Sequence, residues 1–359
     1  MVTLLDCINR VPEITDRIIA NRNENFATFF SVLEGHLDTM DQIVLVGSGT
    51  SNTAAVTARG FIEKVTQIQT ICVLPNEFLN NSGVYRSRAL YIFTSQSGTS
   101  TLTQQAVFKM RQMGYWTVGV TENKDTPLAS QVHVHVDMGC GKEEYGMRTI
   151  GYCASILTLM LLGLEIGHTL GRITEGEYAE LLNHARLISK NHRQISDASM
   201  AWFDRNRQQL MNSTSFTIYG GGSLWGVALE GALKILEISK RKMAVGYEAD
   251  DGMHGPTMGF TPDNCVIALN DGGLDSEKGV QLAKWAKEIM HNGFVFGKDT
   301  LDDSDLAFDP ISQEFISIEF APMVEVLAYR LAVDAGIDLL DKSIHKERDY
   351  FSTHQSLSK

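Results

Sequence analysis

Three charged residues stand at helical spacing in the second half of the chain. Glu230, Lys234 and Glu237 occupy positions i, i+4 and i+7 of a stretch with several apolar residues, so a helix places all three on one side. Burial of such a glutamate raises its pKa towards the working pH of a general base, whereas a neighbouring lysine lowers it again. A trio of this kind is more often a solvent-exposed stripe with an ion pair. The residues around it must decide between the two interpretations.

A histidine follows the charged trio and favours a functional site. His254 comes 17 residues after Glu237 and is followed by Gly255 and Pro256. A lone histidine is more often structural, but the upstream glutamate and the Gly-Pro turn favour a role in a functional site. We therefore expect residues 218–256 to carry the acid–base chemistry of an enzyme.

The end of an earlier predicted strand carries four hydroxyl groups within six residues. The strand that ends at Thr94 is followed by Ser95, Gln96, Ser97, Gly98, Thr99 and Ser100, where the next helix begins. Backbone amides at a helix start lack intrahelical partners, and with hydroxyls and a glycine they are suited to hold a phosphate. An N-cap accounts for one or two of these hydroxyls, but not for four and a glutamine. The loop predicts a phosphate site.

Two short glycine turns invite comparison with nucleotide-binding loops. The first is Gly47-Ser48-Gly49, followed by Thr50 and Ser51, and the second is Gly220-Gly221-Gly222. Neither has the third glycine of a dinucleotide fold, since Asn52 and Trp225 stand at that position. Neither matches the GxxxxGK[ST] loop of nucleotide hydrolases. We expect helix starts after strands, and neither an organic cofactor nor a metal.

The composition is that of an ordinary globular protein of about two domains. The chain has 359 residues, 43% of them hydrophobic, and a formal net charge of -12. This charge argues against nucleic acid and anionic membranes as partners, because both repel such a surface, and it leaves room for a local basic pocket. The longest apolar run, residues 150–164, is short for a membrane span and predicts a buried helix. No secretory signal opens the sequence and the five cysteines are scattered, so we expect a cytoplasmic protein.

Strands and helices alternate along the chain in two rounds. The expected strands are residues 42–46, 68–74, 90–94, 116–121 and 132–136, and then 216–219, 265–269, 294–296 and 315–320. The expected helices include residues 54–64, 101–112, 276–290 and 323–335. The glycine turns align at a constant offset of 173 residues, from Ile43 to Phe216, which predicts a duplicated unit. The fold class is α/β, with two mostly parallel sheets covered by helices on both faces.

The motifs of both halves together resemble a known family. Ser95-Gln96-Ser97-Gly98 after a strand, with the upstream Gly49-Thr50-Ser51, is similar to the sugar isomerase (SIS) domain. Leu229-Glu230-Gly231-Ala232-Leu233-Lys234-x-x-Glu237-Ile238-Ser239 and His254-Gly255-Pro256 resemble the isomerase domain of glucosamine-6-phosphate synthase and its deglycase relatives. The resemblance implies two tandem SIS domains of the flavodoxin-like, three-layer type. We expect leading helices at 1–38, SIS domains at 39–170 and 197–340, a connecting helix at 171–196 and a tail at 341–359.

The resemblance also implies roles for individual residues. The phosphate of a phosphorylated sugar or amino sugar is expected on Ser95, Gln96, Ser97 and Ser100, with support from Gly49, Thr50 and Ser51. Glu237 matches the carboxylate that moves a proton between C1 and C2 of the open-chain sugar, and His254 the residue that assists ring opening. Lys234 matches a residue near the sugar, with Glu230 beside it. The family is usually a homodimer in which the histidine loop of one subunit reaches its neighbour's site, so at least a dimer is expected.

Departures from the family pattern bear on the substrate. The spacing from Glu237 to His254 is one residue longer than usual, and Met147-Arg148-Thr149 replaces a Ser-Thr-Lys segment, so that Arg148 offers a carboxylate-binding fork. For the synthase's C-terminal lysine only Lys346 and Lys359 are candidates, in a tail that is either loose or a flap. Because the sequence starts with Met1-Val2, we expect no glutaminase domain like that of the synthase.

Three functions remain open for such a chain. The leading one is release of an amine or amino acid from an amino-substituted hexose 6-phosphate, by a deglycase or deaminase. The others are aldose–ketose isomerisation of a phosphosugar and sugar-phosphate sensing without turnover. The glutamate and histidine of residues 218–256 favour an enzyme, because mere binding has no need of them.

Overall fold

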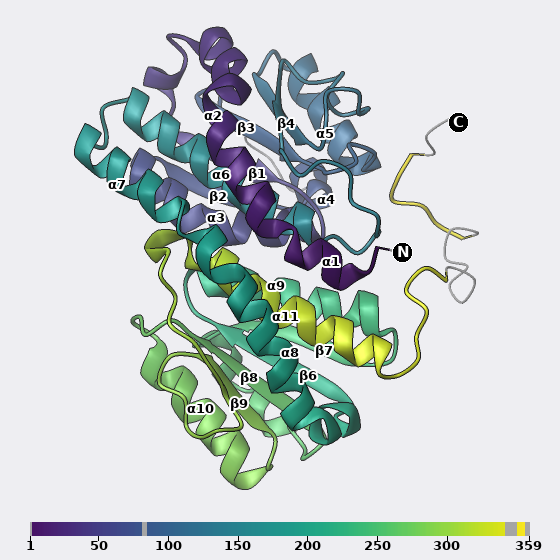
Figure 1. Ribbon diagram of the computed structural model, residues 1–359. Coiled ribbons are helices and arrows are strands. Elements are labelled where there is room, and N and C mark those ends of the chain that lie inside the picture. Colours follow the sequence, from purple (N-terminus) through teal and green to yellow (C-terminus); the bar gives the residue numbers. More distant parts are fainter. Residues whose placement is uncertain (1, 81–84, 342–349, 356–359) are drawn as a thin grey trace. The chain divides into compact units, whose positions relative to one another are not determined.

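The computed structural model describes residues 2–80, 85–341 and 350–355. It divides into two compact units, each built around a five-stranded parallel sheet (Figure 1). The first-sheet unit comprises Ile14–Glu143, Ile150–Leu182 and the described residues from Leu340 onwards. The second-sheet unit comprises the described residues up to Glu13, together with Glu144–Thr149 and Asn183–Leu339. The predicted α/β class with two parallel-sheet domains is confirmed.

The first sheet has the strand order β2-β1-β3-β4-β5. Its strands are β1 (Gln42–Val46), β2 (Gln69–Val73), β3 (Ala89–Thr94), β4 (Thr117–Thr121) and β5 (Val134–Asp137). The chain passes from β1 to β2 in one direction along the sheet and from β3 to β4 in the other. Because such crossovers are right-handed, α3 (Thr50–Thr66) and α5 (Thr101–Gln112) lie on opposite faces. The three expected layers follow from this topology.

Both faces of the first sheet are buried. Alternate residues of β1 and β3 form one core cluster with α4 (Pro75–Asn80) and α5, whose buried members include Val44, Val46, Phe78, Tyr91, Phe93 and Met110. On the other face α3 packs against α6 (Ile150–Thr169), where Gly167 allows contact with the backbone of Val65. α2 (Val11–Leu33) is tied to β5 by Asn25, which donates to the Asp137 carbonyl at 2.6 Å.

α6 is the one helix in the described part of the chain that is long and apolar enough to cross a membrane. Its mean hydropathy is 1.7, and 94% of the residues in that stretch are buried inside the protein. A core helix passes the same test of length and composition. The buried helix predicted at residues 150–164 is confirmed.

The second sheet has the strand order β10-β9-β8-β6-β7, which repeats the first order when read from β7. Its strands are β6 (Ser215–Gly220), β7 (Met243–Glu248), β8 (Asn264–Asn270), β9 (Gly293–Gly297) and β10 (Leu306–Ala307). The accompanying helices are α1 (Leu4–Asn9), α8 (Ile188–Asn212), α9 (Ser223–Lys234), α10 (Ser276–Ile289) and α11 (Ile316–Val333). α7 (Glu175–Ala185) directly precedes α8 in the chain and is divided between the two units.

The glycine turns repeat in backbone geometry as well as in sequence. Gly49 has φ 56° and ψ -130°, and Gly222 has φ 54° and ψ -125°. Each caps the N-terminus of the helix after the first strand of its unit. A Cβ at Gly47 or at Gly220 would collide with the residue four positions on, Ser51 or Leu224. The predicted duplication is therefore present in the backbone angles and the close contacts of these two turns.

One strand prediction was wrong and two strands were missed. Residues 315–320, predicted as a strand, form the end of a short 3-10 helix (Gln313–Phe315) and the start of α11. α11 is buried on nearly all sides, and an apolar run of this kind has no period that separates a helix from a strand. β7 was not predicted because most of its residues are half-exposed and give no apolar run. β10 was not predicted because it has only two residues.

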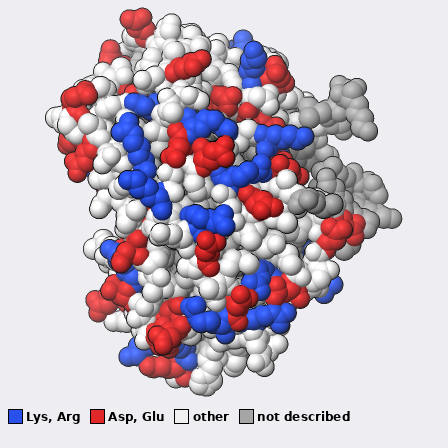
Figure 2. Space-filling view, in the orientation of Figure 1, with Lys and Arg blue, Asp and Glu red and all other residues white. Residues whose placement is uncertain are grey.

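Charges of both signs share the surface drawn in Figure 2. Lys and Arg side chains lie there close to Asp and Glu side chains.

Candidate functional site

Lys234 lies between the two glutamates of the predicted trio. Its Nζ is 2.7 Å from Oε2 of Glu237 and 3.2 Å from Oε1 of Glu230. The side chains of Lys234 and Glu230 are fully buried, whereas that of Glu237 is 39% exposed. The trio is therefore not a solvent-exposed stripe. It is a buried charge cluster that ends in one accessible carboxylate.

A π-helical turn carries Glu237. α9 ends at Lys234, and the backbone continues as a π turn over Ile235–Ser239 before Lys240 enters the left-handed region with φ 54°. π turns are rare and concentrate at functional sites. The helix thus widens in its last turn, at the residue predicted to transfer the proton.

Burial and charge act on Lys234 in opposite directions. Loss of water around the ammonium lowers its pKa, but the carboxylates of Glu230 and Glu237 outweigh this and raise the pKa above its ordinary value. Lys234 is therefore protonated at neutral pH and donates to both neighbours. It can neutralise and orient the two carboxylates, but it is not a free amine that attacks a carbonyl.

Close packing fixes the helix that holds this cluster. A Cβ at Gly231 would lie 2.8 Å from the Ile218 side chain of β6 and 2.8 Å from that of Val324 in α11. α9 approaches both elements this closely only because residue 231 is glycine. Glu230 and Lys234, on either side of that contact, are thereby held in the interior of the second-sheet unit.

His254 stands on an exposed loop between two short 3-10 helices, η3 (Asp251–Met253) and η4 (Pro256–Gly259). Its side chain is 75% exposed, and its Nε2 lies 3.4 Å from Oδ2 of Asp250. Asp250 also pairs with Lys278 at 2.5 Å, and this ammonium, more than the histidine, lowers the pKa of the Asp250 carboxyl. Among the described residues, the imidazole is therefore hydrogen-bonded to Asp250 and not to Glu237.

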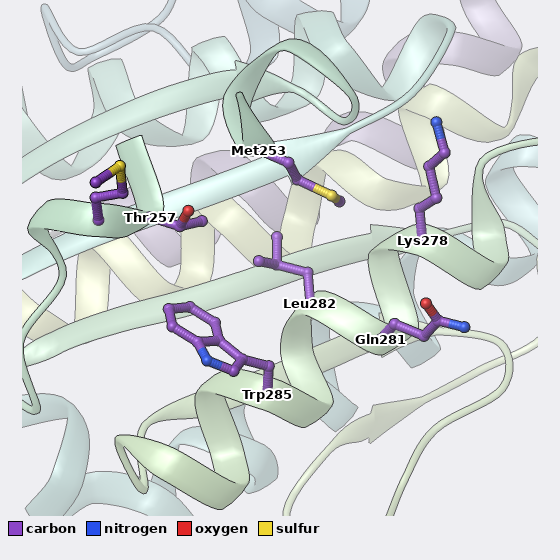
Figure 3. A pocket seen from close by; sticks show the side chains of 7 residues that line it. Met253, Thr257, Lys278, Gln281, Leu282 and Trp285 are labelled. Carbon is purple, nitrogen blue, oxygen red and sulfur yellow. The ribbon is translucent and has the colours of Figure 1, made fainter. Parts of the chain in front are cut away.

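The histidine loop is anchored from its inner side. The Tyr219 hydroxyl donates to the Gly252 carbonyl at 3.1 Å, and a Cβ at residue 252 would lie 2.5 Å from the Tyr219 ring. A shallow open pocket of about 520 Å³ lies between the loop and α10 (Figure 3). It is lined by Met253, Thr257, Met258, Lys278, Gln281, Leu282 and Trp285. These contacts hold the loop and leave His254 in solvent.

The hydroxyl-rich loop lies at the carboxyl end of β3, where α5 begins. Ser100 is the N-cap residue of α5, but its side chain makes no capping hydrogen bond. Its Oγ accepts a hydrogen bond from Oγ1 of Thr103 at 2.9 Å, and Oγ of Ser97 lies 2.8 Å from Oγ1 of Thr99. An N-cap therefore does not explain these hydroxyls, and the phosphate site stays a prediction.

Tight contacts give this loop a single shape. Gly98 has φ 63°, and a Cβ there would lie 2.5 Å from Cβ of Thr126. The Gly98 carbonyl accepts from the amide of Leu128 at 3.1 Å and from Nε2 of Gln104 at 3.2 Å. Ser95 and Gln96 are buried at the start of the loop.

The first glycine turn opens at the same edge of the first sheet. β1 and β3 pair in parallel with Val46 opposite Phe93, so Gly49 and Ser95 both follow the carboxyl ends of neighbouring strands. The chain leaves these two strands in opposite directions, and ligands of such sheets bind at this switch point. Thr50 and Ser51, in the first turn of α3, share that edge with the hydroxyl-rich loop.

The described end of the chain pairs with the hydroxyl-rich loop. The Gln355 amide donates to the Thr99 carbonyl at 2.9 Å, the Thr101 amide donates to the Thr353 carbonyl at 3.1 Å, and Ser100 stands opposite His354 in an antiparallel bridge. In a pair of this type the two opposed side chains lie next to each other. Residues 350–355 are thus not a loose tail. The candidate lysines Lys346 and Lys359 lie outside the described residues.

The predicted site residues fall into two groups on different units. Gly49, Thr50, Ser51, Ser95, Gln96, Ser97 and Ser100 belong to the first-sheet unit. Glu230, Lys234, Glu237, His254 and the half-buried Arg148 belong to the second-sheet unit.

Sequence reasoning missed two residues that contact the predicted ones. Glu143 accepts a hydrogen bond from Nε2 of Gln96 at 3.3 Å, and Asp250 pairs with His254. Asp250 stands four residues before His254, a spacing that hinted at the pair. Glu143 had no such signal, because 47 residues separate it from Gln96.

Comparison with known proteins finds similarity in sequence and in fold. Residues 36–164 match the model of the SIS domain. A glutamine--fructose-6-phosphate aminotransferase [isomerizing] of Gloeobacter violaceus is 26% identical over 309 residues, which are 84% of this chain and 50% of that protein. The chain thus spans about half the length of such relatives.

Solved structures share the fold over nearly the whole chain. A candidate phosphosugar isomerase of Clostridium difficile 630 superposes with a TM-score of 0.86 at 23% identity, covering 97% of this chain and 98% of that one. A glucosamine-6-phosphate deaminase of Thermotoga maritima superposes with a TM-score of 0.69 at 21% identity, covering 93% and 96%. At these identities the structures establish a common fold.

Proposed function

We propose that the chain, whose residues 36–164 match the SIS-domain model and whose fold is shared by proteins named as phosphosugar isomerases, is an enzyme acting on an amino-substituted hexose 6-phosphate. The leading reaction is release of the amine or amino acid by a deglycase or deaminase. Relatives named for fructose 6-phosphate amination and glucosamine 6-phosphate deamination support a substrate with both a phosphate and a nitrogen.

The buried cluster around Lys234 is the observation that carries this proposal. Glu237 is its accessible carboxylate, held at 2.7 Å by a protonated lysine. Such a carboxylate can take a proton from C1 of an open-chain ketosamine and return it to C2. The product is an imine between C1 and nitrogen, and addition of water to C1 then releases the amine and an aldose 6-phosphate. His254, on its exposed loop, assists ring opening or protonates the departing nitrogen.

Phosphate binding is assigned to the first-sheet unit. The loop after β3 has four hydroxyls, whereas the corresponding loop after β8 carries Asp271 and Asp275. The carboxylate of Asp275 also crowds the second glycine turn, since a Cβ at Gly221 would lie 2.6 Å from its Oδ2. A phosphate would be repelled by the negative charge in the loop after β8. In the loop of Ser95–Ser100 it would find hydroxyl and amide donors.

Two other functions compete with amine release. An aldose–ketose isomerase needs only the proton transfer between C1 and C2 by Glu237. A sugar-phosphate sensor needs neither Glu237 nor the buried pair of Glu230 and Lys234. Burial of charges costs free energy that binding alone does not require, and this favours an enzyme.

Assembly and location follow from the same proposal. His254 is exposed on its own unit, which agrees with a homodimer, or a higher oligomer, in which this loop reaches a shared active site of a neighbouring subunit. Arg148 is proposed to bind a carboxylate of the leaving amino acid. We place the enzyme in the cytoplasm and assign it no cofactor.

One experiment separates the three functions. The purified protein is incubated with phosphorylated fructosamines, glucosamine 6-phosphate and fructose 6-phosphate, and the products are identified by mass spectrometry. An amine and an aldose 6-phosphate in equal amounts from a fructosamine support the deglycase, and ammonia and a ketose 6-phosphate in equal amounts from glucosamine 6-phosphate support the deaminase. Conversion of fructose 6-phosphate alone supports the isomerase, whereas binding without any conversion favours the sensor. Turnover that survives unchanged in Glu237→Gln contradicts the assigned mechanism.

A further inference from the structure

Glu143 binds the start of a helix and a residue of the phosphate loop at the same time. Its Oε1 accepts from the amide of Ile150 at 3.0 Å, and its Oε2 accepts from the amide of Gly151 at 3.1 Å. The same Oε2 accepts from Nε2 of Gln96 at 3.3 Å. Both side chains are buried, Glu143 with 6% and Gln96 with 8% of its surface exposed. One carboxylate therefore joins the N-terminus of α6 to the loop after β3.

The space that Gln96 occupies exists because residue 151 is glycine. A Cβ at Gly151 would lie 1.8 Å from Oε1 of Gln96, which no side chain at that position tolerates. A carboxylate only accepts hydrogen bonds, so it turns the NH₂ of the Gln96 amide towards Glu143 and its oxygen towards Gly151. The orientation of Gln96 is thus set by Glu143, which precedes α6, and by Gly151 in its first turn.

The main chain of Gln96 is fixed as well. Its carbonyl accepts from the amide of Glu122 at 2.9 Å, and the amide of Ser95 donates to the Val120 carbonyl at 3.1 Å. These bonds hold the loop to β4, while the side chain holds it to α6. The side chain of Gln96 is used in this brace, so the residue offers a phosphate its backbone amide.

We infer that Glu143 is a positioning residue for phosphate binding, which acts through Gln96 by holding the first turn of the Ser95–Ser100 loop in its binding shape. This inference rests on the proposed phosphosugar site. It assigns Glu143 no contact with the substrate. The side chain of Gln96, which was predicted to bind the phosphate, is assigned instead to holding the loop in place.

The test compares binding with stability in matched variants. Glu143→Gln keeps the shape and one acceptor, but it cannot accept from Gln96 and both backbone amides together. Dissociation constants for inorganic phosphate and for glucosamine 6-phosphate are measured by calorimetry for the wild type, Glu143→Gln, Gln96→Ala and the double variant. Glu24→Gln, on the exposed side of α2 in the same unit, controls for the lost charge. Thermal unfolding midpoints are recorded for all five proteins.

We expect the substitutions at Glu143 and Gln96 to weaken phosphate binding through the same contact, so that their effects do not add. Glu143→Gln and Gln96→Ala each weaken binding about ten-fold, as expected for one hydrogen bond to a charged group, and the double variant is no weaker than either single one. Glu24→Gln binds as the wild type does. Losses that multiply in the double variant overturn the inference, as does unchanged binding with a lowered unfolding midpoint, which leaves Glu143 a helix cap only. A wild type that binds neither probe contradicts the proposed function itself.

Discussion

The ammonium of Lys234 lies 2.7 Å from a carboxylate oxygen of Glu237 and 3.2 Å from one of Glu230, with no solvent exposure of the lysine or of Glu230. Charge neutrality in the core of the second-sheet unit depends on this contact. Removal of one partner leaves a buried charge uncompensated, whereas removal of a whole pair does not. Stability and catalysis can therefore be separated by choosing which partner is replaced.

Replacement of Lys234 should destabilise the protein strongly. Lys234→Met leaves the fully buried Glu230 without its cation, which should lower the free energy of unfolding by about 3–5 kcal/mol. Glu230→Gln/Lys234→Met removes that charge as well and should recover most of the loss. Urea unfolding of the three proteins measures both effects. Equal loss in the single and double variants would mean that the pair does not govern stability.

Replacement of Glu237 should affect turnover and leave the fold intact. Its side chain is 39% exposed, so Glu237→Gln keeps size and hydrogen bonding without leaving a fully buried charge. We expect kcat to fall by at least about 100-fold, the usual contribution of a general base, with the dissociation constant of the phosphosugar little changed. Glu288→Gln, on the exposed side of α10, is the control and should keep full turnover.

The shape of the phosphate loop should depend on Gly98. Gly98→Ala combines a left-handed φ of 63° with a collision at 2.5 Å against Thr126, and should weaken phosphosugar binding and lower stability by roughly 1–3 kcal/mol. Gly114→Ala is the matched control, since Gly114 has φ 79° and nothing within 4 Å of an added Cβ. Calorimetry measures phosphosugar binding and thermal unfolding measures stability for both variants. The difference between the variants gives the effect of the collision, because both have the backbone strain. A similar loss of binding in both would refute the special role of this contact.

The paired end of the chain should support the same loop. Gln355→Pro removes the amide that donates to the Thr99 carbonyl, and should weaken phosphosugar binding by roughly two- to ten-fold, the range expected for one hydrogen bond. Gln355→Ala keeps that amide and should bind as the wild type does. Binding isotherms at constant ionic strength test the difference. Identical affinities for the two variants would show that the bridge between Ser100 and His354 has no role in binding.

Acid should destabilise the protein through His192. This histidine of α8 is fully buried, both its ring nitrogens lack a partner among the described residues, and burial lowers its pKa from 6.5 to about 3. The unfolded chain takes up the proton first, so this contribution to stability is complete above pH 6.5 and is lost as the pH falls from there towards 3. The loss should be about 1.4 kcal/mol per pH unit. Urea unfolding at pH 7 and 5.5 should show it in the wild type and not in His192→Leu.

Local patterns predicted much of the fold. The helix expected at 101–112 is α5 with the same ends, and the strand expected at 42–46 is β1. Both begin after a sharp change of polarity and have a clear period. Residues 315–320 have neither, and their helix forms because α11 is packed on nearly all sides in the interior. There the surroundings outweighed the β propensity of the segment.

The candidate site was predictable where it is local in sequence. The i, i+4 and i+7 spacing brought Glu230, Lys234 and Glu237 together, and the four hydroxyls of the loop before α5 marked the helix start. The bond between Glu143 and Gln96 and the pairing of the chain's end with the loop join distant segments. No spacing rule reaches across 47 residues.

The α/β class, the duplication and the residue types at both candidate sites could be predicted from local sequence patterns, because these depend on the periods of helices and strands and on turns of a few residues. Tertiary structure alone decided that Glu230 and Lys234 are buried while Glu237 is accessible, and that the turn at Glu237 is a π turn. It also decided that Gln96 braces the loop through Glu143. Burial and hydrogen-bond partners are set by neighbours from other parts of the chain, and the energy of a charge depends on those neighbours more than on its position in the sequence.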